Sequence, residues 1–271
     1  MHPEDNKEVV KDFLRLVKID PPKPSVEALG ELTRAFMRFP YENLTKIIRV
    51  EEEADPVRRM RTPDIVLGDH VDVGAGGTCF SLTHFFEQVL ARCGYRCSPV
   101  LCDRSYGEDT HCALIAEIDG SRYLVDPGYL LEHPVELPKK RFSKIETPLS
   151  EARVTRLGET SQYLLSTLSG GRETIRYRLK DNPVSEEIFR QRWIDSFDWS
   201  QMNQLCVTRL KSCGHVYLRD VHLKHSTIER RSREKIERDF EKVVENTFGI
   251  DERVVEQAMR LTARKRSQLL R

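Results

Sequence analysis

The sequence has little net charge of either sign, because 44 lysines and arginines balance 43 aspartates and glutamates and leave a formal net charge of +1. Charged residues still make up 32% of the chain, so the two signs are mixed. Even the basic C-terminal end, residues 226–271, interleaves acidic side chains with its lysines and arginines. Because no global field attracts polyanions, we expect no nucleic acid and no membrane surface among the partners.

Long hydrophobic runs are absent as well. No stretch reaches the about 18 consecutive apolar residues that a membrane-spanning helix needs. The first residues, MHPEDNKEVVKDF, lack the basic start and the apolar run of a signal peptide. We therefore expect a cytoplasmic protein.

The sequence also lacks the pattern of a disulfide framework. Its seven cysteines are an odd number and follow no export signal, which indicates reduced thiols. A zinc site is the alternative use of four of them, but their spacing matches no paired zinc knuckle: Cys93, Cys97, Cys102 and Cys112. We expect no metal, so a special cysteine would be special for its reactivity.

Helical periodicity dominates the first third. Apolar residues recur at helical spacing in residues 7–18, 25–38 and 78–93. Ser25 is a candidate N-cap for the second of these helices, and Gly94 is placed to end the third in a left-handed conformation. The first third is therefore predicted to be a helical bundle.

After Gly94 the apolar period changes to two. Three strand-like runs follow, and Asp119-Gly120 between the second and third is a strong hairpin signal: YRCSPVLCD (95–103), HCALIAEI (111–118) and SRYLVD (121–126). Residues 133–150 are polar and punctuated by proline, which predicts a loop, and two more strand-like runs cover 161–168 and 173–179. The middle third is predicted to be an antiparallel sheet or small barrel.

The last third mixes both periods. Asn182-Pro183 indicates a linker, followed by a helix near 185–193, strand-like stretches at 204–210 and 215–223, and helical runs to the end. We therefore expect an α+β fold in three units, residues 1–93, 94–182 and 183–271.

The stretch GAGGTCF, residues 74–80, places a cysteine where a helix begins. The unpaired N–H groups of a helix N-terminus favour a thiolate at Cys79. Gly76 and Gly77 let the backbone turn sharply and could leave N–H groups free for a substrate oxyanion, which predicts a substrate-binding role for both. The alternative is a buried cysteine that packs as a small hydrophobic residue.

The hairpin supplies a base for this cysteine. If Asp119-Gly120 is the two-residue loop, the register places Gly128 opposite His111 and Asp126 opposite Ala113. His111 and Asp126 then share a face as diagonal neighbours about 7 to 8 Å apart. Each could instead be an ordinary strand histidine or turn aspartate, but together with Cys79 they match a nucleophile, a base and an orienting acid.

Four blocks resemble the arylamine N-acetyltransferases in order and spacing: FPYENL (39–44), GGTCF (76–80), HCALIAEIDG (111–120) and YLVDPGYL (123–130). The resemblance implies an N-terminal helical bundle, an antiparallel β-barrel and a C-terminal α/β lid. It also implies that acetyl-CoA acetylates Cys79, that His111 and Asp126 complete a catalytic triad, and that Tyr129 lines the acceptor pocket.

The sequence departs from the family pattern around the nucleophile. The family usually has Arg-Gly-Gly-x-Cys-x-Glu-x-Asn, where this chain has Ala75, Ser81 and Thr83. Pro127 and Leu130 differ from the small residue or valine and the glycine that are common there. Because two opposite charges are absent together, we expect the fold to survive and substrate choice to change.

We expect an acyltransferase that moves an acetyl group from acetyl-CoA to an aromatic amine or hydrazine through a Cys79 thioester. One alternative is a cysteine amidase or transglutaminase-like acyltransferase with a different acyl donor. The other is a catalytically silent protein that binds an aromatic ligand. The sequence predicts no oligomeric state.

Overall fold

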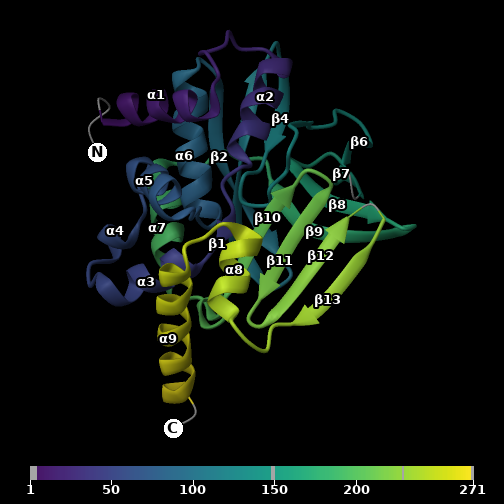
Figure 1. Cartoon of the computed structure of the whole chain (residues 1–271). Coiled ribbons are helices and arrows are strands. Elements are labelled where there is room, and N and C mark those ends of the chain that lie inside the picture. Colours follow the sequence, from purple (N-terminus) through teal and green to yellow (C-terminus); the bar gives the residue numbers. More distant parts are fainter. Residues whose placement is uncertain (1–4, 148–149, 228, 270–271) are drawn as a thin grey trace.

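The computed structural model describes residues 5–147, 150–227 and 229–269. Figure 1 shows the N-terminal helices gathered on one side of the molecule and two β-sheets on the other, with the C-terminal helix α9 extending away from them. The fold is α+β, as predicted: helices, then a nearly closed antiparallel barrel, then a second sheet with helices. This arrangement positions one cavity between the helices and the two sheets.

The N-terminal helices form because their apolar faces meet in an aromatic core. Their bounds are α1 (Asp5–Val17), α2 (Val26–Phe36), α3 (Leu44–Glu52), α4 (Pro56–Arg59), α5 (Pro63–Val73) and α6 (Cys79–Arg92). Phe13, Phe36, Phe39 and Phe85 are almost completely buried and pack ring against ring. Ser25 is the N-cap of α2, since its hydroxyl accepts the Ala28 N–H at 3.1 Å. The predicted helical first third is confirmed.

The barrel sheet has the strand order β5-β4-β3-β2-β9-β8-β7-β6, and its edge strands β5 and β6 approach each other. The bounds are β2 (Arg96–Arg104), β3 (Gly107–Ile118), β4 (Ser121–Val125), β5 (Val135–Glu136), β6 (Phe142–Thr147), β7 (Ser150–Arg156), β8 (Gln162–Ser169) and β9 (Arg172–Lys180). Ile118 pairs with Ser121 across the Asp119-Gly120 turn, whose two residues have φ of 48° and 75°. The predicted hairpin register is confirmed from the Ile118–Ser121 pair to the Leu114–Val125 pair, and the predicted pairs of Ala113 with Asp126 and His111 with Gly128 do not form.

The loop predicted at residues 133–150 is wrong for much of its length. It contains β5 and β6, and β7 begins at Ser150, while residues 148 and 149 lie outside the described chain. Strand β6 is an edge strand with alternating exposed and half-buried residues, so its sequence FSKIET carries charges on the solvent side. Charged edge strands protect a sheet from pairing with other chains, and that polarity hides their strand pattern.

The second sheet has the strand order β1-β10-β11-β12-β13. Its strands are β1 (Tyr41–Glu42), β10 (Cys206–Lys211), β11 (Gly214–Arg219), β12 (His222–Thr227) and β13 (Arg231–Lys235). The helices of the last third are α7 (Glu186–Asp195), which packs against α6, α8 (Phe240–Phe248) and α9 (Glu252–Leu269). The strand-like stretch 215–223 is broken by Asp220, which has φ of 51° and turns the chain into β12. Strands β12 and β13 fall where helical runs to the end were predicted, so that prediction is wrong before residue 240.

Strand β1 comes from the N-terminal third but pairs with β10 in this second sheet. The first predicted unit, 1–93, therefore contributes one strand to the sheet of the third unit, 183–271. The boundaries of the three units 1–93, 94–182 and 183–271 remain a prediction. In the part of the chain that the structure describes, no helix is long and apolar enough to cross a membrane.

Candidate active site

Cys79 is the first residue of helix α6, and it is buried. Thr78 is the N-cap, but in the described chain its side chain makes no capping hydrogen bond, unlike the capping serines of α2 and α7. The first-turn N–H groups of α6 therefore receive no side-chain acceptor from the cap, and Thr78, Cys79 and Phe80 all line the cavity. The nucleophile candidate sits where a helix end can favour negative charge.

His111 on β3 contacts Asp126, which follows β4 directly. The His111 Nε2 and Asp126 Oδ2 atoms are 2.7 Å apart, and both side chains are buried. The ladder between β3 and β4 ends at Leu114 and Val125, so the backbone turns at Asp126 before the predicted pairing with Ala113. The two side chains still meet, because that turn directs Asp126 back toward β3.

The three groups perturb one another's proton affinity. Hydrogen bonding from Cys112, together with the hydrogen bond and charge of His111, holds the pKa of Cys79 well below its usual range despite burial. Burial opposes a charged imidazole, but the Asp126 carboxylate and Cys79 together raise the pKa of His111 to about 9. The arrangement favours a thiolate beside an imidazolium, which is the reactive form of a cysteine nucleophile.

Gly128 also belongs to the site, although the sequence indicated it only as the residue opposite His111 in the hairpin. A Cβ placed on it would lie 2.5 Å from the Cys79 Cβ and 3.1 Å from the His111 Cε1. Only glycine lets this turn come so close to the nucleophile. The Pro127-Gly128 turn after the hairpin was the available signal.

Tyr129 follows in the same turn. Its N–H donates to the Asp126 Oδ1 atom at 2.8 Å, and its side chain lines the cavity edge-on to Tyr177. The Tyr129 N–H thus helps to fix the Asp126 carboxylate, which in turn contacts His111. The structure brings Cys79, His111, Asp126 and Tyr129 to one place.

Gly76 and Gly77 lie beside the cavity but are not among the residues that line it. The Gly77 N–H donates to the Pro40 carbonyl at 3.2 Å, so it is not free for a substrate oxyanion, contrary to the prediction. A Cβ on Gly76 would lie 1.9 Å from the Pro40 oxygen, and one on Gly77 would lie 2.3 Å from the Ser81 Oγ. Gly76 is thus required by the Pro40 backbone in the close turn before Cys79.

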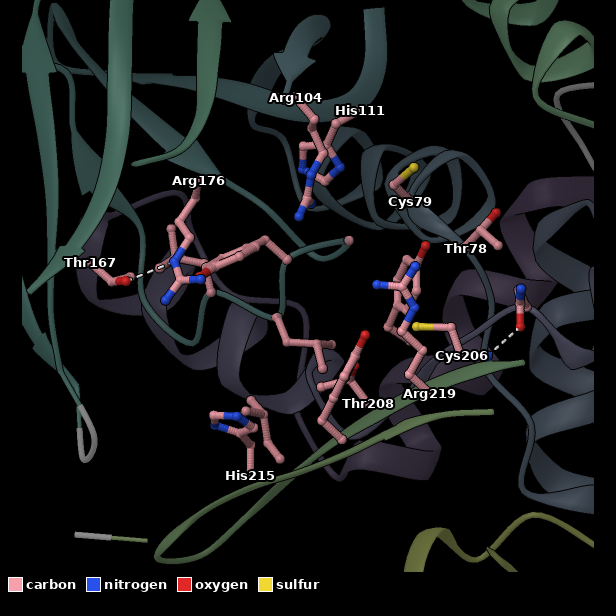
Figure 2. Close-up of a pocket in the computed structure, with 18 of the residues that line it drawn as sticks. Thr78, Cys79, Arg104, His111, Thr167, Arg176, Cys206, Thr208, His215 and Arg219 are labelled. Carbon is pink, nitrogen blue, oxygen red and sulfur yellow. Dashed lines mark hydrogen bonds between the residues drawn. The ribbon is translucent and has the colours of Figure 1, made fainter. Parts of the chain in front are cut away.

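The cavity has a volume of about 710 Å³ and reaches from Cys79 and His111 to the second sheet. Figure 2 shows Arg104 beside His111, with Arg176, His215 and Arg219 on other sides of the same space. His215 on β11 also lines the cavity. Only one acid, Glu132, is among the described lining residues.

The cations of this lining have no acidic partners in the described chain. None of its five lysines and arginines forms an ion pair with a described carboxylate: Lys46, Arg104, Arg176, Arg219 and Lys224. Arg176 and Arg219 donate instead to neutral oxygens, and Arg104 lies over the ring of Tyr106. The cavity is therefore locally positive, although the whole chain carries a net charge of only +1.

The four cysteines considered for zinc do not gather around a centre. Among the described residues no group of three or more histidine, cysteine, aspartate or glutamate side chains is placed to hold a metal ion. Cys112 instead lies next to Cys79, and Cys102 is buried in the barrel core.

Comparison with known proteins assigns the chain to a family. A family model described as N-acetyltransferase matches residues 25–256, which is most of the chain. The chain belongs to the arylamine N-acetyltransferase family.

Solved arylamine N-acetyltransferases share the fold. The enzyme from Mycobacterium abscessus is 16% identical with a TM-score of 0.80, and 94% of each chain is covered. The enzyme from Salmonella typhimurium is 20% identical with a TM-score of 0.75, covering 93% of this chain and 97% of that one. At these identities the likeness shows the fold alone.

A curated relative carries a different name. Proansamycin X synthase from Amycolatopsis mediterranei is 28% identical over 111 residues, which are 38% of this chain and 41% of that protein. The match therefore spans about two fifths of that relative's length.

The positions that depart from the family pattern are buried and neutral. Ala75 is fully buried, and the Ser81 hydroxyl donates to the Thr78 carbonyl at 3.1 Å. Thr83 is in contact with Cys112, since the Cys112 thiol donates to its hydroxyl at 3.5 Å. Leu130 adopts φ of 58°, a left-handed conformation that costs a residue with a Cβ roughly 1 kcal/mol and explains why glycine is common there.

Proposed function

We propose that this acyltransferase moves an acetyl group from acetyl-CoA to an arylamine or hydrazine by a ping-pong reaction. The observation that carries the proposal is the contact set of Cys79, His111 and Asp126 at the wall of the cavity. The Cys79 thiolate attacks the thioester carbonyl, the bond to the CoA sulfur breaks, CoA takes the proton of the His111 imidazolium and leaves as its thiol, and the acetyl group stays on the Cys79 sulfur. The acceptor amine then attacks this thioester and releases Cys79.

In the second half-reaction His111 takes the proton that the attacking amine loses. Asp126 accepts from His111, fixes the ring orientation and stabilises its charged form. The oxyanion of each tetrahedral intermediate would accept from the uncapped N–H groups at the start of α6. Gly77 is excluded from this role by its bond to Pro40.

The unpaired cations of the cavity support a polyanionic donor. A CoA thioester carries several phosphate charges, and arginine side chains are well suited to bind phosphate. Arg104, Arg176 and Arg219 are candidates for these contacts. The cavity volume is in the range that holds a ligand of this kind in part.

The test is intact-mass analysis after incubation with acetyl-CoA and no acceptor. We expect a gain of one acetyl group on Cys79, removed when an arylamine is added. A protein that gains no mass, although Cys79 is alkylated rapidly at neutral pH, would contradict acetyl-CoA as donor. A Cys79 that is neither acylated nor alkylated would support the ligand-binding alternative.

A second candidate is amide formation from a different acyl thioester. It is favoured by the partial similarity to proansamycin X synthase and by the altered residues Ala75, Ser81 and Thr83 beside the nucleophile. The same mass experiment with longer acyl thioesters distinguishes the two, since this candidate predicts a larger mass gain on Cys79 and none from acetyl-CoA.

A further inference from the structure

The turn that delivers Cys79, residues 75–78, is held by hydrogen bonds to its carbonyls, most of them from residues outside helix α6. Two of its residues are glycines, which have the greatest backbone freedom and give the turn no intrinsic rigidity. Each of its four carbonyls accepts a hydrogen bond: Ala75 from the His70 ring, Gly76 from Arg61, Gly77 from the Glu42 N–H, and Thr78 from Ser81 and the Leu82 N–H. The position of the nucleophile therefore depends on these donors.

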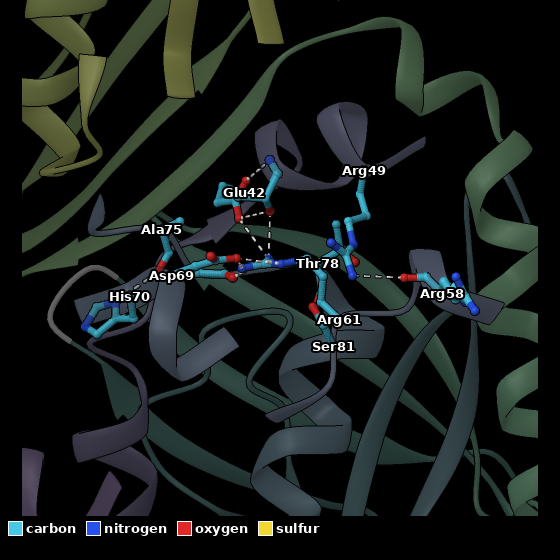
Figure 3. A network of polar contacts seen from close by, with 11 residues as sticks. Glu42, Arg49, Arg58, Arg61, Asp69, His70, Ala75, Thr78 and Ser81 are labelled. Carbon is cyan, nitrogen blue, oxygen red and sulfur yellow. Dashed lines mark hydrogen bonds and ion pairs between the residues drawn. The ribbon is translucent and has the colours of Figure 1, made fainter. Parts of the chain in front are cut away.

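Arg61 is the one charged donor to this turn among the described residues. Its Nη1 atom lies 2.6 Å from the Gly76 oxygen, and its side chain is only 5% exposed. Figure 3 shows the guanidinium at the centre of a network of polar contacts beside the turn. A buried, charge-assisted hydrogen bond of this kind is stronger than a neutral one.

The rest of the guanidinium is fixed by two different helices. Nε and Nη2 donate to the Asp69 Oδ2 atom on α5 at 3.2 and 2.7 Å. Nη1 also donates to the Thr45 hydroxyl on α3 at 2.7 Å, and Thr45 donates in turn to Glu42. Arg61 thus joins α3 and α5 to the Gly76 carbonyl, three residues before the nucleophile.

The same contacts supply a buried acid and a buried cation beside the turn, although the chain lacks the arginine and the glutamate that the family pattern has at positions 75 and 81. Glu42 is fully buried and lies 3.4 Å from the Arg61 Nη1 atom, so its carboxylate has a cationic neighbour that enters from outside the Gly-Gly-x-Cys block. With Ala75 in place, the cation reaches the turn from residue 61 instead.

We propose that Arg61 is a positioning residue for the nucleophile: its guanidinium fixes the Gly76 carbonyl and, through the turn, sets the Cys79 thiol against His111. The proposal rests on Cys79 being the nucleophile of the proposed function. It assigns Arg61 no contact with substrate, since Arg61 does not line the cavity.

The experiment measures iodoacetamide alkylation of Cys79 against pH by intact mass, which needs no acyl donor. In Arg61→Met we expect the alkylation rate at pH 7 to fall on the order of 10- to 100-fold, because a displacement of about 1 Å breaks a catalytic contact. The pH midpoint should move upward as the thiol loses its contact with His111. Arg61→Lys keeps the charge without the planar fork and should lie between Arg61→Met and wild type.

Two further variants separate positioning from folding. Arg61→Met with Glu42→Gln leaves no buried carboxylate stranded and should fold, yet should keep the slow alkylation. Arg122→Met is the matched control, because it removes the arginine from buried Asp181 and from none of the hydrogen bonds to the turn. It should lower the thermal midpoint but leave the alkylation profile unchanged.

The outcomes are distinct. A folded Arg61→Lys or double variant with the wild-type rate and pH midpoint would overturn the role of Arg61 and leave the proposed function intact. A wild-type Cys79 that resists alkylation at neutral pH would overturn both.

Discussion

The two walls of the cavity are built in different ways. The wall of the nucleophile comes from short contiguous stretches, a turn with a helix start at 75–80 and a hairpin with its following turn at 111–130. The opposite wall comes from β10, β11 and β12, which contribute alternate residues: Thr208 and Leu210, Tyr217 and Arg219, Lys224 and Ser226. The residues proposed for the reaction therefore lie in short contiguous motifs. The shape and charge of the opposite wall are instead set by every second residue of the sheet strands.

This contrast predicts different kinetic consequences for the two walls. Changes on the nucleophile wall should reduce the rate of acyl transfer with every donor and acceptor. Changes on the sheet wall should alter substrate affinity and leave the chemical step nearly intact.

The largest expected effect is that of Cys79→Ala. Without the thiol no acyl-enzyme can form, so intact-mass analysis should show no acetyl gain and transfer to an arylamine should be undetectable. Cys213→Ser, at the exposed cysteine of the β10–β11 turn, is the control and should behave as wild type. An active Cys79→Ala protein would disprove the mechanism.

Asp126→Asn should slow both half-reactions by on the order of 10³-fold, because His111 loses the carboxylate that orients it. Stopped-flow measurement of CoA release and of amine acetylation separates the two steps. Equal rates in the variant and in wild type would exclude an orienting role for Asp126.

The same variant has a defined pH dependence of stability. Because the folded protein raises the pKa of His111 from 6.5 to about 9, its protonation contributes stability that is complete below pH 6.5 and is lost as the pH rises through 9. Asp126→Asn removes that contribution. Denaturant titrations should therefore show a larger loss of unfolding free energy at pH 6 than at pH 9.5.

Gly128→Ala should reduce transfer by on the order of 100-fold, because its Cβ would lie 2.5 Å from the Cys79 Cβ and must push the nucleophile from His111. Gly68→Ala is the matched control: it lies within α5 with open space around it, and should gain up to about 1 kcal/mol of stability without loss of rate. Full activity in Gly128→Ala would mean that the turn relaxes freely.

The smallest expected effect lies on the cation lining. Arg176→Gln should raise KM for acetyl-CoA by about threefold to fivefold with little change in kcat, as for one partly solvated charge contact. Arg178→Gln, an exposed position on the same strand that does not line the cavity, should leave KM unchanged. Arg176 lies on β9 of the barrel, outside both walls, so a fall in kcat instead of a rise in KM would contradict its role as a binding contact for the donor.

Much of the nucleophile wall was predictable because its signals are local. The Asp119-Gly120 turn set the hairpin register, and Gly94, with φ of 85°, ended the helix that Cys79 begins. The meeting of His111 with Asp126 follows from that register even though the ladder stops one pair before it. The assignment of catalytic roles to these residues remains a prediction.

The remaining features depend on contacts that no local pattern records. Strand β6 is polar because it is an edge strand, so its sequence resembles a loop. The predicted stretch 215–223 ran β11 into β12 because the turn between them is made by Asp220, which has a positive φ but is not a glycine. Arg61 is separated by 15 residues from the carbonyl it holds, and nothing near residue 61 suggests a role at the nucleophile. His215 reaches the cavity only because β11 lines the same space as Cys79 and His111.

The two-residue strand β1 has a mechanical consequence. Its Glu42 N–H bonds the Gly77 carbonyl on one side, and its residues Tyr41 and Glu42 pair with Thr208 and Val207 of β10 on the other. The backbone that carries the nucleophile is thus laterally bonded to the strand that forms the opposite wall. Any substrate that displaces β10 must therefore either move the Cys79 turn with it or break these hydrogen bonds.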